Sequence, residues 1–212
     1  MTSMNKILIA SRNSGKIDEY RELLQGLPVV IVSLLDFSDL PEIKETGTTF
    51  RENALIKARV AAAAIGQMAL ADDSGLEVDY LQGAPGVFSS RYAGPGQNDK
   101  ANNKKLLQAL EGVPSYRRGA RFRCVIALVT PQGREYLSEG ICEGTITTQP
   151  CGTKGFGYDP LFLIPSLGKT FAELGSDVKN RISHRSMAMR AMRDVLIHLL
   201  EEGIEEDCGS VS

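Results

Sequence analysis

The most constraining feature of the chain is a strand–helix–strand pattern near its beginning. Residues 7–10 form a short unbroken apolar run, which is typical of a buried strand. Apolar residues then recur at helical spacing over residues 17–24, and Gly26 and Pro28 are expected to end this helix. The β-branched run 29–35 predicts a second strand. A strand, a helix and a strand in this order favour an α/β fold.

The remaining pattern predicts a mixed sheet. Two extended segments separated by a Pro-Gln-Gly turn suggest an antiparallel hairpin, which would not occur in a purely parallel sheet. We expect helices at 50–65, around 106–110 and from about Ser183, and strands at 68–71, 122–129, 136–147 and 161–164. We assign residues 1–212 to a single α/β domain, with residues 204–212 as a frayed tail.

Composition excludes several classes of protein. Of the 212 residues, 42% are hydrophobic and 24% are charged, as in globular proteins and unlike disordered ones. The net charge of -2 provides no general attraction to nucleic acid or to anionic lipid, so neither is an expected partner. A protein with this charge can bind phosphate only through a few local cations.

Cysteine usage and the N-terminal residues point to a reduced, cytoplasmic protein. Cys124, Cys142, Cys151 and Cys208 form no C-x-x-C pair, and the chain has only two His, which argues against structural zinc. The apolar run near the start is too short for a signal peptide, and no run approaches the roughly 20 residues of a membrane span.

The first candidate site is a polar segment between the first predicted strand and helix. It consists of Ser11, Arg12, Asn13, Ser14, Gly15 and Lys16. A helix N-terminus in this position favours an anion, although the segment lacks the glycine spacing of a Walker A loop. Asn13 or Ser14 could instead simply cap the helix. Lys16 in the first turn opposes the helix dipole, and a bound phosphate would resolve that conflict.

The second candidate is acidic. Asp72 and Asp73 follow the apolar run 68–71, and we expect Ser74 and Gly75 to turn the chain there. Magnesium is held by one or two carboxylates together with substrate phosphates, so one residue of this pair is a candidate ligand and Glu45 could be the second. A solvated turn or a helix cap is the alternative interpretation of the acidic pair.

The third and fourth candidates lie in the last third of the chain. Glycines on both sides of Phe156 would leave its ring accessible for stacking on a flat heterocycle, although a turn with a core Phe is also compatible. His184 and Arg185 fall in the first turn of the last helix, where cations are unfavourable without an anionic or carbonyl-bearing ligand. The basic run that contains Arg118 and Arg121 is interpreted as a solvated strand face.

Taken in order, these segments resemble the inosine triphosphate pyrophosphatase family, and the resemblance extends from residue 6 to about residue 192. The segments are 11–16 (SRNSGK), 45–47 (ETG) with 50–54 (FRENA), 71–76 (ADDSGL), 83–86 (GAPG) with 90–92 (SRY), 155–160 (GFGYDP) and 182–185 (ISHR). The chain departs from the family in having Ser11 and Arg12 where Thr-Gly is common.

The resemblance implies a fold, a reaction and roles for residues. The fold would be an elongated twisted mixed sheet flanked by helices, with two lobes and the active site in the cleft between them. Noncanonical purine triphosphates such as ITP, dITP and XTP would be hydrolysed to the monophosphate and pyrophosphate by a homodimer that uses Mg²⁺. Asp73 would be catalytic and Glu45 and Asp73 would bind metal; substrate would contact Ser11, Arg12, Asn13, Ser14, Gly15, Lys16, Ser74, Phe156, Gly157, Tyr158, Asp159, Lys179, His184 and Arg185. Two alternatives are a related pyrophosphatase for pyrimidine or modified bases and a nucleotide sensor without turnover.

Overall fold

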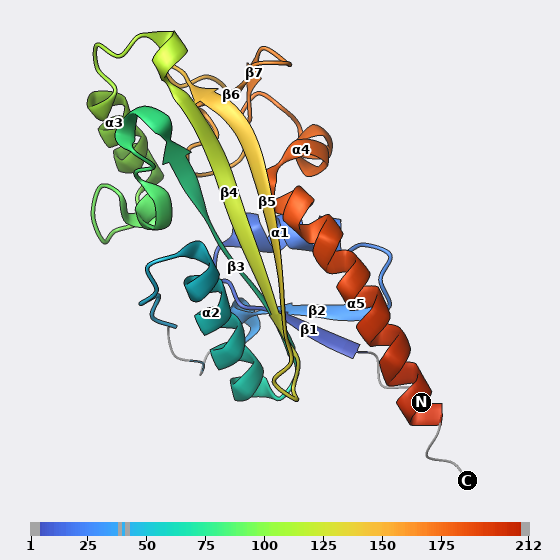
Figure 1. The fold of residues 1–212 in the computed structure, drawn as a ribbon. Coiled ribbons are helices and arrows are strands. Elements are labelled where there is room, and N and C mark those ends of the chain that lie inside the picture. The colour runs from blue at the N-terminus through green and yellow to red at the C-terminus, as the bar shows by residue number, and fades with distance from the viewer. Residues whose placement is uncertain (1–4, 38–39, 41–42, 209–212) are drawn as a thin grey trace. The chain divides into compact units, whose positions relative to one another are not determined.

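The computed structural model describes residues 5–37, 40 and 43–208 and has the predicted α/β architecture (Figure 1). The helices are α1 (Ser14–Leu23), α2 (Phe50–Ile65), α3 (Asp99–Ala109), α4 (Ser176–Ile182) and α5 (His184–Cys208). The strands are β1 (Asn5–Ile9), β2 (Val29–Ser33), β3 (Met68–Val78), β4 (Gly119–Val129), β5 (Glu135–Ile146), β6 (Phe162–Ile164) and β7 (Lys169–Thr170). Within the described ranges, no helix has the length and apolar character needed to cross a membrane.

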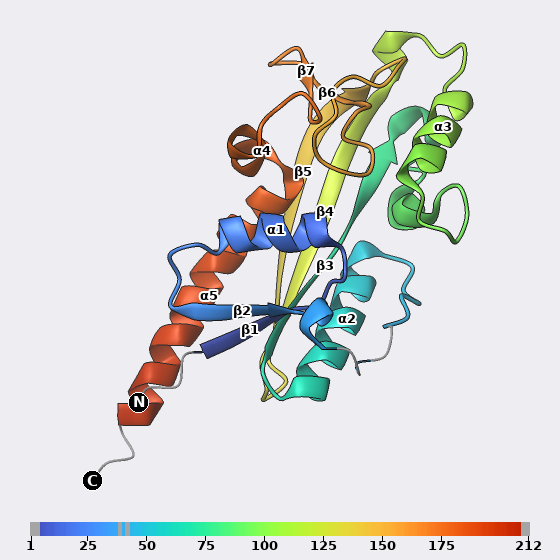
Figure 2. The same ribbon diagram turned by 180° about the vertical axis from the view of Figure 1, so that it is seen from behind.

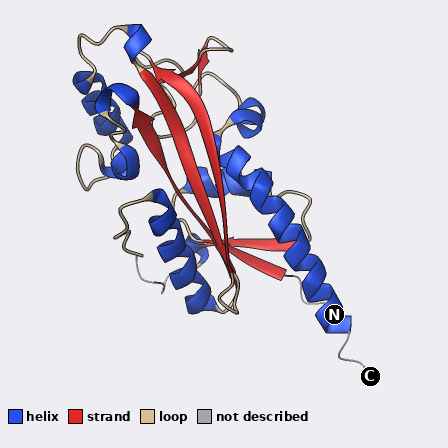
Figure 3. Cartoon of the chain, in the orientation of Figure 1, coloured by secondary structure: helices blue, strands red, loops and turns tan. Residues whose placement is uncertain are grey.

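The strands form one sheet of mixed direction, as the sequence predicted. In the described part of the chain, its strands follow the order β2-β1-β3-β4-β5-β6-β7. β1 pairs in parallel with β2 and β3, whereas β6 pairs antiparallel with β5 and β7. β4 and β5 are neighbours joined by the predicted turn, and both are long, as Figure 3 shows.

The chain divides into two compact units. The first comprises Met1–Asp72, Val125–Glu139 and Ala188–Ser212, and the second comprises Asp73–Cys124 and Gly140–Met187. The expected cleft between two lobes and the assignment of a single domain both stay predictions. α5 continues to Cys208, through part of the segment expected to be frayed, and residues 209–212 lie outside the described residues.

The first unit is built on the predicted β1–α1–β2 segment. Ile7, Leu8 and Ile9 of β1 are buried, because β1 lies between β2 and β3. α1 buries Ile17 and Tyr20, and Figure 2 shows it lying along β2. The long α2 ends at Gly66, whose left-handed φ of 61° suits glycine.

The second unit is built around an aromatic cluster. The Phe122 ring lies 4.5 Å from Phe162 and 5.9 Å from Phe171, measured between ring centroids. Leu76 and Val78 of β3 are completely buried in the same core. The predicted turn at Ser74 and Gly75 is therefore wrong: β3 continues to Val78 because its later residues are needed in this core.

The sequence analysis did not predict β7 and α4, but it did predict where α5 begins. β7 and α4 are too short for their periodicity to be recognised in the sequence. The predicted start of the last helix is confirmed, because Ser183 Oγ accepts a hydrogen bond of 3.2 Å from the Ser186 amide.

Candidate active site

The segment before α1 is organised by its own side chains. Asn13 Oδ1 accepts the Lys16 amide over 3.0 Å, and Ser11 Oγ accepts the Asn13 amide over 3.1 Å. Asn13 is therefore the N-cap, and Ser14 and Gly15 form the first helical turn. The Arg12 guanidinium donates to the Leu40 carbonyl over 2.8 Å.

Lys16 is paired with a carboxylate of β3. Its Nζ lies 2.9 Å from Asp72 Oδ2, and the Asp72 side chain is almost fully buried. A cation in the first turn of α1 is unfavourable, and this ion pair offsets that cost. Asp72 thus compensates the positive charge of Lys16, for which the sequence analysis had expected a bound phosphate. The Lys16 side chain is still 17% exposed.

Glu45 is held by a side chain from the middle of α2. Lys57 Nζ lies 2.5 Å from Glu45 Oε1, in a pair that is partly buried. The following residues are fixed too, because the Gly47 amide donates to Asn53 Oδ1 over 2.8 Å. A Cβ on Gly47 would approach Glu52 Cβ to 2.6 Å, so the loop can approach α2 closely only with glycine there.

β3 carries three of the candidate residues in succession. Asp72 and Asp73 are 3% and 6% exposed, so both carboxylates are buried, and Ser74 is half-buried. Adjacent strand residues point to opposite faces of the sheet, so Asp72 and Asp73 face different surroundings. Asp72 pairs with Lys16, so the Asp73 side chain points to the opposite face of β3.

Glu45 in the first unit and Asp73 in the second carry donor atoms that suit a hard cation. Among the described residues, no group of three or more His, Cys, Asp or Glu side chains is arranged to hold a metal ion. Mg²⁺ ordinarily takes one or two protein carboxylates and completes its octahedron with water and substrate phosphate. Glu45 and Asp73 supply carboxylate oxygens of the required kind, so the residues present fit this metal.

The segment around Phe156 is fastened by Asp159. Asp159 Oδ2 accepts the Phe156 amide over 3.0 Å and the Lys179 ammonium over 2.7 Å. The Asp159 and Lys179 side chains are 4% and 9% exposed. Lys179 Nζ also lies 4.8 Å from the centre of the half-buried Phe156 ring, at cation–π distance. Lys179 lies in the last turn of α4.

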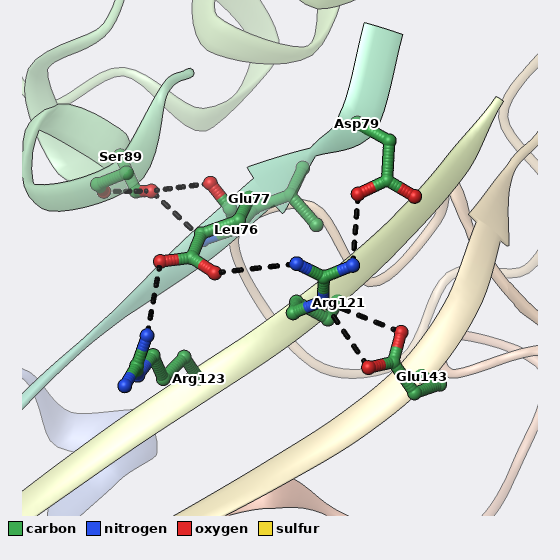
Figure 4. A network of polar contacts seen from close by, with 8 residues as sticks. Leu76, Glu77, Asp79, Ser89, Arg121, Arg123 and Glu143 are labelled. Carbon is green, nitrogen blue, oxygen red and sulfur yellow. Dashed lines mark hydrogen bonds and ion pairs between the residues drawn. The ribbon is translucent and has the colours of Figure 1, made fainter. Parts of the chain in front are cut away.

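Tyr158 faces the core. Its hydroxyl donates to the Ser89 carbonyl over 2.8 Å, and burial raises its pKa well above the ordinary tyrosine value. Ser89 Oγ in turn accepts the Leu76 amide of β3 over 2.9 Å, as Figure 4 shows. Tyr158 therefore connects the Phe156 segment, through Ser89, to the strand that carries Asp73 and Ser74.

Arg185 and His184 are buried at the start of α5. Arg185 is 1% exposed, donates to Ser74 Oγ over 3.0 Å and has its guanidinium carbon 5.9 Å from the centre of the Phe156 ring. The His184 ring stacks on Phe122 with centroids 4.8 Å apart. Arg185, Ser74 and Phe156 are thus brought together within the second unit.

Sequence reasoning missed the side chains that hold the candidates in place. Lys57 and Asn53 lie on the buried, Ala-rich face of α2. Polar residues on an otherwise apolar helix face were a signal in the sequence that could have identified them. Ser89, Asp99 and Asn103 carried no comparable signal, because their partners are backbone groups far away in the sequence.

The basic run is only partly a solvated face. Arg118 is 5% exposed and donates to the carbonyls of Leu110, Val113 and Thr147, so the expectation for this residue is wrong. Arg121 lies at the surface of β4 and pairs with Asp79 over 2.8 Å and Glu143 over 3.1 Å (Figure 4).

Comparisons with known proteins show what the whole chain is similar to. The sequence model of the Ham1 family matches residues 7–195. The chain is 52% identical over 202 residues to a dITP/XTP pyrophosphatase of Geobacter sulfurreducens, covering 95% of this chain and 100% of the relative. It is 51% identical over 194 residues to a dITP/XTP pyrophosphatase of Desulforamulus reducens, covering 92% and 96%. A solved HAM1 protein from Coxiella burnetii is 47% identical with a TM-score of 0.83, over 92% of this chain and 100% of that one.

Proposed function

Because the chain belongs to the Ham1 family, and its relatives with about half of their residues identical are named dITP/XTP pyrophosphatases, we propose that it hydrolyses noncanonical purine nucleoside triphosphates. ITP, dITP and XTP are converted to the monophosphate and pyrophosphate, which removes them from the nucleotide pool. The protein is a nucleoside triphosphate pyrophosphatase, a hydrolase of phosphoric anhydride bonds.

The reaction is attack of water on the α-phosphorus. Asp73 accepts the proton of this water, a role that needs a carboxylate in a defined environment. Its burial at 6% exposure, on a strand whose other face is occupied by the Lys16–Asp72 pair, supports this role. Pyrophosphate leaves with the electron pair of the broken P–O bond.

The phosphates are bound by the N-terminal segment and by Lys179. Residues 11–16 present the amides of a helix N-terminus together with the Lys16 ammonium. Fixed positive groups of this kind stabilise the charge that develops on the phosphate oxygens. Lys16 and Lys179 are each already paired with a carboxylate, so both are fixed before substrate arrives.

The observation that carries the proposal for the base is the buried guanidinium of Arg185, which lies beside the Phe156 ring. Hypoxanthine and xanthine carry an acceptor at the 6 position, whereas adenine carries a donor there. A pocket lined by donors such as Arg185 leaves the amino group of adenine without a partner, which is strongly rejected. His184 and residues 156–159 complete the surroundings of the base, and Ser74 contributes to substrate binding.

The metal is Mg²⁺, held by Glu45 and Asp73. When bound, it neutralises charge on the phosphate oxygens of the substrate. Carboxylate ligands support this assignment over zinc or copper, which favour His and Cys. Metal dependence is measured by titrating Mg²⁺ into enzyme treated with a chelator; full activity without a divalent cation would contradict it.

The protein works in the cytoplasm as a homodimer. Within the part of the chain that the structure describes, Cys124, Cys142 and Cys151 take part in no disulfide, in keeping with a reducing compartment. The dimer is proposed from the family resemblance, and sedimentation equilibrium tests it. A monomer at assay concentrations would contradict the dimer while leaving the reaction unaffected.

A substrate panel tests the proposed function. Pyrophosphate release is measured from ITP, dITP, XTP, ATP, GTP and UTP with and without Mg²⁺. We expect release from the first three and little from ATP and UTP. Binding without release would favour a nucleotide sensor, and preference for UTP would favour a pyrimidine or modified-base pyrophosphatase.

A further inference from the structure

α3 holds the candidate base-binding segment by its backbone. The Gly157 amide donates to Asp99 Oδ2 over 2.7 Å, and Asn103 Nδ2 donates to the Gly157 carbonyl over 3.0 Å. Asp99 and Asn103 are four residues apart in α3 and so lie on one face of the helix. Both backbone polar groups of Gly157 are therefore bound by one rigid element.

The segment needs such support because its glycines give it conformational freedom. Gly155 and Gly157 have φ angles of 75° and 61°, in a region that side-chain-bearing residues rarely adopt. Asp159 fixes the Phe156 amide from within the segment, and Tyr158 anchors its other side in the core. The contacts of Asp99 and Asn103 fix the residue between Phe156 and Tyr158.

The Asn103 side chain makes this contact through its Nδ2 while its Oδ1 has no hydrogen-bond partner among the described residues. Donation to the Gly157 carbonyl fixes the orientation of the amide, and Asn103 Oδ1 is then buried without a hydrogen-bond partner among the described residues. A buried acceptor without a partner is unfavourable, so stability alone does not account for asparagine at this position.

We propose that Asp99 and Asn103 are positioning residues that hold Phe156 and Gly157 in the conformation that binds the purine. The inference rests on the proposed function, because it assigns the effect to base binding. Neither residue acts on the phosphates, so their loss weakens affinity for the base and leaves the chemical step largely intact.

The test compares Asp99→Ala, Asp99→Asn and Asn103→Leu with the wild-type enzyme. We expect Asp99→Ala to raise KM for dITP about tenfold with kcat within about twofold, since one hydrogen bond to a charged group is lost. Inhibition by inosine monophosphate should weaken in parallel, and inhibition by pyrophosphate should not change. Asp99→Asn keeps an acceptor and should restore most of the affinity. Asn103→Leu should raise KM less, without loss of thermal stability.

Asn98→Ala is the matched control, because Asn98 caps α3 by accepting the Ala101 amide and does not touch Gly157. It should lower Tm with no change in KM. Unchanged KM and inhibition constants in both Asp99→Ala and Asn103→Leu would overturn the inference, as would a loss of kcat alone. Failure of the wild-type enzyme to release pyrophosphate would instead refute the proposed function. In that case hydrogen exchange of the Gly157 amide still tests whether Asp99 holds this segment. Exchange should be faster in Asp99→Ala, and an unchanged rate would overturn the inference.

Discussion

Lys16 and Asp72 form an ion pair of 2.9 Å, although they are 56 residues apart in the sequence. Lys16 neutralises this buried carboxylate, and in the proposed function it also carries a positive charge for the phosphates. Lys16→Met should therefore lower stability by about 1.5–3 kcal/mol, the usual value of a hydrogen bond to a charged group, and raise KM for every triphosphate. Thermal denaturation and kinetics measure the two effects separately.

The double variant Lys16→Met with Asp72→Asn separates these roles. It should recover most of the lost stability, because the neutral amide of the Asp72→Asn side chain needs no ammonium partner. It should not recover KM. Recovery of both would show that Lys16 acts only through Asp72.

Asp73→Asn tests the proton acceptor. The amide keeps the size of the side chain but cannot take a proton, so the rate should fall on the order of 100-fold or more. Asp79→Asn is the control, because Asp79 is an exposed partner of Arg121 and has no proposed role in the reaction. A rate for Asp73→Asn within a few-fold of wild type would remove this residue from the base role.

The contrast between β1 and β3 shows what the sequence could predict. The β1–α1–β2 segment was predicted because its signals are local: an apolar run, a helical period and the stop at Gly26 and Pro28. The end of β3 was predicted wrongly, because Asp72 to Gly75 has the composition of a turn. Burial of Leu76 and Val78 in the core overrides that local preference.

In the candidate site, too, features set by neighbouring residues were predicted and those set by distant residues were not. A cap at Asn13 or Ser14 and a helix start near Ser183 were predicted, because such signals depend only on the next few residues. The partners of Glu45, Asp159 and Gly157 were not, because Lys57, Lys179 and Asp99 meet them only after folding. The resemblance implies which residues form the site, and the structure shows which contacts hold their side chains.

Arg185→Ala tests how the base is read. KM for dITP should rise about tenfold or more, since hydrogen bonds to a buried guanidinium are lost. The inhibition constant of inorganic tripolyphosphate, which has no base, should stay within about twofold. Arg185→Lys keeps the charge in case the first variant folds poorly, and should show the same selective loss. Equal effects on dITP and tripolyphosphate would mean that Arg185 binds phosphate.

Gly155→Ala should disrupt the Phe156 segment. A Cβ at Gly155 would overlap Asp159 Oδ2, which Lys179 holds in place. Gly133→Ala is the control, because Gly133 has a similar φ of 81° with open space around it. The control should lose about 1–2 kcal/mol from backbone strain alone. Gly155→Ala should lose more and also bind dITP less tightly; equal losses of stability would contradict the steric account.

Glu52 should make stability depend on acid pH. Hydrogen bonds from the Thr48 amide, the Thr48 hydroxyl and the Thr49 amide lower the pKa of Glu52 below its ordinary value. A lowered folded-state pKa stabilises the protein above the unfolded pKa of 4.5, and this contribution disappears as the pH falls through the folded value. The Tm difference between wild type and Glu52→Gln should therefore shrink between about pH 6 and pH 3. The exposed Glu111→Gln variant is the control, and a difference that does not vary with pH would contradict the assignment.

The fate of the attacking water tests the central claim most directly. The enzyme is given dITP in water enriched in oxygen-18, and the products are separated and weighed by mass spectrometry. Attack at the α-phosphorus predicts one labelled oxygen in the deoxyinosine monophosphate and none in the pyrophosphate. Label in the pyrophosphate, or release of orthophosphate with the diphosphate, would contradict the account.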